Sequence, residues 1–186
     1  AHTAAFWVDK YEVTNAMFKE FLDATHYAPT DARDFLKHWK NGQIQKGAEN
    51  QPVRWVNMAD AQTYAAWTGK RLPTEEEWEK AARGTDGRRY PWGDHPDPGR
   101  FVLLGYFRSS SNVPQDADSL PGGASPFGCL HVEGNVGEFT VSLDDFQQWK
   151  NWTVIRLKVS PTDTRKLSPP DWRQGTIGFR CVKDSN

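Results

Sequence analysis

Residues 71–84 read RLPTEEEWEKAARG and carry the signals of a helix with a defined start and end. Thr74, followed three residues later by Glu77, is a capping box, in which the hydroxyl and the carboxylate each bond a backbone amide of the first turn. Acidic residues fill the first turn and basic residues the last, as the helix dipole favours. Gly84 suits the left-handed conformation that ends many helices. The pattern predicts a short helix between Thr74 and Gly84.

The same reasoning predicts further elements on either side of this helix. Thr14 and Asn57 are candidate N-caps for helices that run to Ala24 and to Gly69. Alternating or β-branched runs predict strands over residues 6–13, 53–56, 152–157 and 176–182. We expect one buried aromatic cluster made of Trp55, Tyr64, Trp67, Trp78, Trp92, Phe139 and Phe179.

Composition limits the classes of protein and partner. At 186 residues the chain is most simply one domain over residues 1–186, and 27 of these residues are Gly or Pro, which fits a loop-rich body. The 23 basic and 24 acidic residues nearly cancel, so no electrostatic argument favours a nucleic acid or an anionic membrane as partner. No apolar run approaches the roughly 20 residues that cross a bilayer, so no direct membrane insertion is expected.

Four motifs in order give the chain a family resemblance. They are DKYEVTN at 9–15, the stretch 71–84 with YPWG at 90–93, GNV with Glu138 at 134–138, and IGFRC at 177–181. Together they resemble the formylglycine-generating-enzyme family, also called the sulfatase-modifying-factor family. The resemblance implies an α+β fold, a modified C-type-lectin-like fold with little regular secondary structure. Family members usually carry another strand upstream, which is missing here. Many bacterial members are extracytoplasmic, and we expect a periplasmic or secreted location.

The residues that catalysis requires in this family are not found at the matching positions. Catalytic members oxidise a cysteine with copper held by two cysteines, and the stretch aligned with that site, residues 154–160, contains none. The two cysteines of the chain, Cys129 and Cys181, lie in other motifs. The five histidines show no i, i+4 pair of metal-ligand type. We therefore predict that the chain is not an enzyme and has no certain cofactor.

The state of the two cysteines stays open at this point. In secreted members the cysteine matching Cys181 is often bridged to one at the position of Ala65, which this chain cannot do. Cys181 is either a buried free thiol or paired with Cys129, and burial as a small apolar group favours the free thiol.

Calcium is the one ligand that the resemblance still suggests. The family binds Ca²⁺ in the third motif, where the matching ligands are the carbonyls of Gly134 and Val136 and the carboxylate of Glu138. His131 stands where an oxygen ligand is usual and suits a hard cation poorly. The alternative is that Glu138 is satisfied by backbone amides or an arginine. Arg71 and Arg180 are expected to be buried and paired with carboxylates, for which Glu12, Glu77 and Glu79 are the candidates.

These observations predict a non-catalytic binding module that contacts a protein partner. The contact surface is predicted in 101–127 together with 146–172, because segments without scaffold motifs concentrate aromatic residues there. The alternative for each ring is that it fills the core. Two other functions stay open: a diverged metal-dependent oxidoreductase, and a ligand-binding variable protein of a diversity-generating system. The predicted partner-binding residues are Tyr106, Phe107, Trp149, Trp152 and Trp172.

Overall fold

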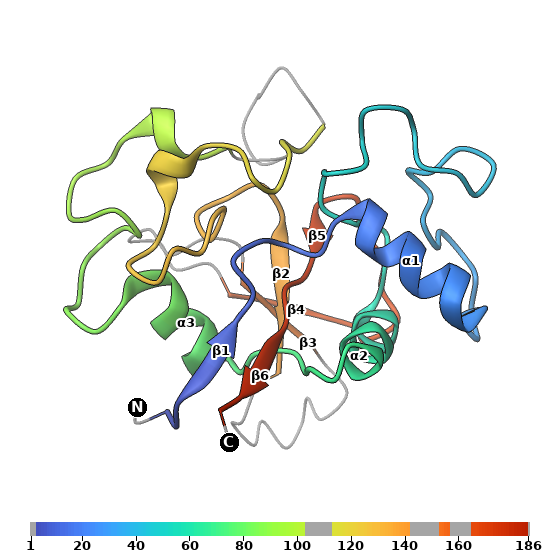
Figure 1. The fold of residues 1–186 in the computed structure, drawn as a ribbon, viewed down its shortest axis with the longest axis horizontal. Coiled ribbons are helices and arrows are strands. Elements are labelled where there is room, and N and C mark those ends of the chain that lie inside the picture. Colours follow the sequence, from blue (N-terminus) through green and yellow to red (C-terminus); the bar gives the residue numbers. More distant parts are fainter. Residues whose placement is uncertain (1–2, 103–112, 142–152, 157–164, 186) are drawn as a thin grey trace.

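Helices flank a central set of short strands (Figure 1). The computed structural model describes residues 3–102, 113–141, 153–156 and 165–185. In Figure 1, α1 and α2 lie on one side of β2 and β5, and α3 lies on the other. The α-helices are α1 (Asn15–Thr25), α2 (Met58–Trp67) and α3 (Glu75–Arg83), and the 3₁₀ turns are η1 (Pro98–Arg100) and η2 (Pro121–Gly123).

The helices begin and end where the sequence predicts. Thr74 and Asn57 each form a full capping box, with Glu77 and Asp60 as the reciprocal partners. Thr14 accepts a hydrogen bond from the amide of Met17 at the start of α1. Gly84 ends α3 at a φ of 71°, which a residue with a side chain adopts only with strain. The predicted helix boundaries are therefore confirmed to within a residue or two.

The strands form two sheets. The larger has the order β4-β3-β2-β5, and the smaller is the antiparallel pair β1-β6. In the larger sheet β2 pairs antiparallel with β3 and parallel with β5, so that Glu138 stands opposite Arg156 on one side and Gly178 on the other. The strands are β1 (Phe6–Val8), β2 (Gly137–Thr140), β3 (Thr153–Arg156), β4 (Arg165–Ser168), β5 (Ile177–Gly178) and β6 (Val182–Asp184).

Three strand predictions need correction. The strand predicted over 6–13 ends at Val8, and the one over 176–182 divides into β5 and β6, which belong to different sheets. Residues 53–56 form no strand, because Trp55 adopts a left-handed φ of 54° that interrupts an extended chain.

The core consists of two clusters of buried side chains. The larger contains Tyr64, Phe139 and Phe179, whereas Trp78 belongs to a second cluster with Ala81, Ala82, Cys129 and Val132. The prediction of one cluster was therefore wrong.

Three of the predicted rings are not fully buried. Trp67 is 40% exposed because it is the last residue of α2. Trp92 is half-buried in a loop, where it stacks on Tyr90 and Phe101. Trp55 is half-buried beneath the ammonium group of Lys37. Each of these three rings therefore lies at the edge of the core and not at its centre.

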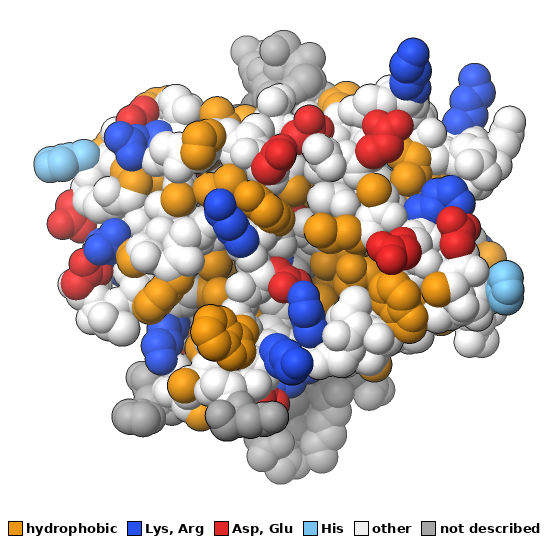
Figure 2. Space-filling model, viewed as in Figure 1, with side chains coloured by type: hydrophobic (Ala, Val, Ile, Leu, Met, Phe, Trp, Pro, Cys, Tyr) orange, Lys and Arg blue, Asp and Glu red, His pale blue; other side chains and the backbone are white. Residues whose placement is uncertain are grey.

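Charges of both signs are mixed over the face of the molecule shown in Figure 2. No helix within the described ranges is long and apolar enough to cross a membrane. Figure 2 shows acidic and basic side chains interspersed over one face, with apolar side chains between them. This pattern agrees with the near-zero net charge of the sequence.

Candidate functional site

A buried ion pair between Glu138 and Arg180 lies at the centre of the molecule. Glu138 is on β2, all four residues of which are buried, and Arg180 follows β5. The guanidinium Nε and Nη2 donate to the two carboxylate oxygens at 2.7 and 2.6 Å, and Nη2 also donates to the carbonyl of Leu130 at 2.7 Å. Both side chains are completely buried. This is the bidentate geometry that makes arginine–carboxylate pairs strong.

A second carboxylate, Glu12, adjoins this pair from the first motif. It accepts a hydrogen bond of 2.7 Å from Nδ2 of Asn135 and a longer one from the amide of Val136. The pKa of Glu12 is raised well above its ordinary value, first because burial removes the hydration of the charged form and second because Glu138 is close. Arg180 and Asn135 oppose this rise.

Trp78 ties α3 to the same pair. Its indole Nε1 donates to Glu138 Oε2 at 2.8 Å, and its ring lies beneath the guanidinium of Arg156 at 5.1 Å. Arg156 in turn forms an ion pair with Glu79 on α3. Glu12, Trp78, Glu138 and Arg180 come from the four sequence motifs in turn. The motifs that carry the resemblance therefore meet in one buried polar network.

The network engages both carboxylate oxygens of Glu138. Both carboxylate oxygens accept from Arg180, and one also accepts from Trp78. Within the described ranges, no group of three or more His, Cys, Asp or Glu side chains is arranged to hold a metal. Calcium binding by Gly134, Val136 and Glu138 remains an untested prediction. The alternative, an arginine partner for Glu138, is what the structure contains.

The two arginine predictions differ in outcome. Arg180 is buried and paired as expected, but with Glu138 and not with the carboxylates named from the sequence. Arg71 pairs with Glu77 at 2.6 Å as predicted, but its side chain is 38% exposed and also reaches Asp184. Arg71 thus fastens the start of α3 to β6 at the surface.

The cysteines do not fit a copper pair. Cys129 and Cys181 are free, fully buried and belong to different core clusters. Burial raises the pKa of both thiols, that of Cys181 to about 12. Copper(I) needs neighbouring thiolates, which burial disfavours here. The prediction of free thiols is confirmed.

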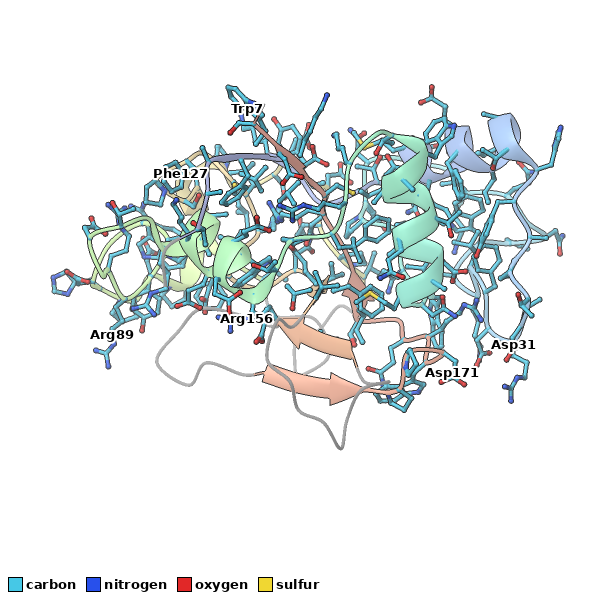
Figure 3. The ribbon with its side chains drawn as sticks, turned by 90° about the horizontal axis from the view of Figure 1, so that it is seen from below. Trp7, Asp31, Arg89, Phe127, Arg156 and Asp171 are labelled. Carbon is cyan, nitrogen blue, oxygen red and sulfur yellow. The ribbon has the colours of Figure 1, made fainter. Side chains whose placement is uncertain are left out.

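Part of the predicted partner surface can be located. Trp172 is 37% exposed, on the turn that leads to β5. Tyr106, Phe107, Trp149 and Trp152 lie outside the described residues. Asp171, next to Trp172, and Phe127 lie in opposite halves of the view in Figure 3. The contact surface over 101–127 and 146–172 stays a prediction, because four of its five named residues lie outside the described ranges.

The turn that carries Trp172 is anchored by Arg173, a residue that no sequence motif singles out. Arg173 is buried, pairs with Asp60 of α2 at 2.9 Å and donates to the carbonyls of Asp31 and Arg33. From the sequence, an arginine in a polar segment looks like a surface residue. Only the fold shows that Arg173 is buried and paired with Asp60.

With this geometry established, the class of the protein follows. The model of the sulfatase-modifying factor enzyme 1-like domain matches residues 1–185. The chain belongs to this family.

Several relatives of the chain are named as enzymes. The chain is 32% identical over 193 residues to a formylglycine-generating enzyme of Mycobacterium tuberculosis, covering 74% of this chain and 64% of the relative. It is 30% identical over 175 residues to a hercynine oxygenase of Mycolicibacterium smegmatis, covering 81% of this chain and 40% of the relative. The chain thus spans less than two thirds of the length of either. The prediction that the chain is not an enzyme was wrong, because relatives at this level of identity are named as enzymes.

A solved structure supports the fold. The crystal structure of CarF aligns with a TM-score of 0.78 and 18% identity, covering all of this chain and 88% of the other. At that identity the likeness establishes the fold alone. It agrees with the predicted formylglycine-generating-enzyme-like architecture.

Proposed function

We propose that this domain binds a protein partner through a surface centred on the turn 169–175. The observation that carries the proposal is that Trp172 presents a large ring, 37% exposed, from a backbone that cannot easily move. Aromatic side chains at fixed positions supply much contact area at low cost in conformational entropy, and tryptophan is enriched among residues that dominate binding energy.

The turn is fixed by contacts on both sides of the ring. The amide of Trp172 donates to the carbonyl of Pro169 at 3.1 Å. Arg173 is anchored to Asp60, and its guanidinium packs over the ring of Phe35 at 5.3 Å. A partner would therefore meet a preformed surface, and binding would not have to order the loop first.

Charged residues lie near the turn, since Arg173 donates to the carbonyls of Asp31 and Arg33. Asp171 is exposed, and its charge acts on the guanidinium of Arg33, which itself pairs with Asp31 at 2.6 Å. An aromatic centre with a polar margin is the usual anatomy of a protein interface. Binding of a partner is compatible with catalysis, since an enzyme that acts on a protein must also hold it.

The test uses the exposed ring of Trp7 as a matched control. Trp7, on β1, is 72% exposed and lies far from the Asp171 turn (Figure 3). Tagged wild-type, Trp172→Ala and Trp7→Ala proteins are used to capture partners from extracts of the source organism. We expect one specific protein to be retained by wild type and Trp7→Ala but lost with Trp172→Ala, at an unchanged melting temperature. Equal retention by all three, or unfolding of Trp172→Ala, would overturn the proposal.

The predicted residues outside the described ranges extend the same experiment. Tyr106→Ala and Trp149→Ala should weaken capture of the same protein if they belong to the surface. Variants that unfold the domain would instead assign these rings to the core.

Oxidation chemistry is the second candidate function, and the names of the relatives favour it. The cysteines of this chain do not fit the copper pair, so a metal would need other ligands. Metal analysis of the purified chain tests this candidate. Copper or iron at one equivalent would support it, and calcium alone or no bound metal would count against it.

A further inference from the structure

A second site lies between the start of α1 and the loop that follows it, and one of its lining residues, Arg54, reaches the turn 169–175. A cavity of about 230 Å³ opens there. Asn15 and Trp39 are buried at its floor, and the exposed residues Gln45, Lys46 and Gly47 form its outer wall. Its volume is below the roughly 300–1,000 Å³ of sites for drug-sized ligands, so an occupant must be small.

The hydrogen bonds at the floor fix the tautomer of His38. Asn15 Nδ2 donates to the carbonyl of Ala48 at 2.8 Å, which identifies Oδ1 as the oxygen that faces the cavity floor. Oδ1 accepts from Trp39 Nε1 at 2.9 Å and contacts His38 Nε2 at 2.8 Å. Because an amide oxygen has no hydrogen to give, Nε2 must carry the proton and Nδ1 must be a bare acceptor.

His38 is also neutral. Burial, followed by the charge of Arg54, lowers the pKa of His38 to about 3. Its Nδ1 is buried and has no hydrogen-bond partner in the described part of the chain. A buried acceptor without a partner costs free energy, which a donor on a bound molecule would recover.

The charged groups of the cavity are cations. Arg54 donates through Nη1 to the carbonyl of Gly175 at 2.7 Å, while its Nε is buried without a partner among the described residues. Lys46 stands at the exposed wall, and no aspartate or glutamate lines the cavity. Apolar side chains, Ile44 and Val113, complete the lining. The cavity thus offers positive charge and an apolar wall, with one unpartnered acceptor buried behind its lining.

We propose that this cavity binds a small carboxylate with a hydroxyl group on the neighbouring carbon. The carboxylate lies against Arg54 and Lys46, and the hydroxyl donates to Nδ1 of His38. Nδ1 of His38 and Nε of Arg54 are covered by other protein atoms. Binding therefore requires a local shift that exposes these two atoms to the cavity. The proposal is independent of the partner surface at Trp172.

The test varies the ligand, which avoids any risk of unfolding the protein. Amide chemical shifts are followed by NMR during titration with lactate, with propionate, which lacks only the hydroxyl, and with lactamide, which lacks the charge. We expect lactate to shift the amides of Gly47 and Ala48. Propionate should bind roughly threefold to tenfold more weakly through loss of one hydrogen bond, and lactamide at least about tenfold more weakly.

A pair of lysine variants checks the location. Lys46→Met should weaken lactate binding about twofold to fivefold, whereas Lys19→Met, which removes a lysine paired with Asp23 on α1, should leave it unchanged. Equal binding of lactate and propionate would overturn the role of His38. Shifts confined to residues outside the cavity, or no shifts with any of the three compounds, would overturn the site itself.

Discussion

Replacing Arg180 by methionine tests whether the buried network holds the domain together. The variant keeps much of the side-chain volume but removes both hydrogen bonds to Glu138 and the one to Leu130. Removing one partner of a buried ion pair costs about 3–5 kcal/mol, because the other charge stays buried without compensation. A domain of this size loses roughly 2–4 °C in melting temperature per kcal/mol, so the expected fall is about 6–20 °C.

The pH dependence of this loss identifies its cause. Arg180 lowers the pKa of Glu12, so its removal raises that pKa further. A carboxyl group whose pKa is raised in the folded state contributes to the free energy of unfolding at pH values below its unfolded pKa, about 4.3. This contribution is lost as the pH rises through the pKa of the folded state. The deficit of Arg180→Met relative to wild type should therefore be smaller near pH 5 than near pH 8.

Two further variants complete the experiment, with unfolding followed by calorimetry and by denaturant titration. Arg71→Met breaks a pair whose arginine is 38% exposed and should cost about 1 kcal/mol or less. Adding Glu138→Gln to Arg180→Met removes the uncompensated charge and keeps an acceptor for Trp78, so the double variant should lose less than the sum of the two single losses. If Arg180→Met costs no more than Arg71→Met, or its deficit is independent of pH, the reasoning fails.

Three other perturbations have defined outcomes. Thr74→Ala removes a capping box and should cost about 1 kcal/mol in denaturant unfolding, with an unchanged far-UV spectrum. Gly123→Ala would bring a new Cβ to 2.1 Å from a backbone carbonyl oxygen and should destabilise by about 1–3 kcal/mol, whereas the neighbouring Gly122→Ala meets nothing within 4 Å and should be tolerated. Cys129 and Cys181 are buried, and the pKa values of both thiols are raised. Near neutral pH we expect a thiol reagent to leave both cysteines of the folded protein unlabelled and to label both after unfolding. Rapid labelling of the folded protein would contradict their burial.

The sequence predicted the parts of the fold that depend on neighbouring residues. The caps at Thr14, Asn57 and Thr74 are local signals, and each lies at the start of a helix. The strands were less predictable, because pairing partners far apart in the chain determine their ends. Nothing local indicates that Trp55 takes a left-handed conformation.

The candidate sites were also hard to predict, because they depend on contacts between residues far apart in the sequence. The motifs identified Glu138 and Arg180 as important but could not pair them, because 42 residues separate them along the chain. The cavity beside His38 could not be predicted at all, since apart from Asn15 it is formed by loop residues that match no motif. Its character depends on the tautomer of one histidine, which only the position of Asn15 reveals.

The pairing of β1 with β6 has a consequence for protein engineering and for evolution. β1 and β6 lie side by side (Figure 1), and Ser185 donates to the carbonyl of Ala5 next to them. A host protein could therefore carry this unit inside one of its surface loops without spreading the loop apart, and the ends could be joined by a short linker and reopened elsewhere. Such a domain can be moved between multidomain architectures as an insert while its interior stays intact.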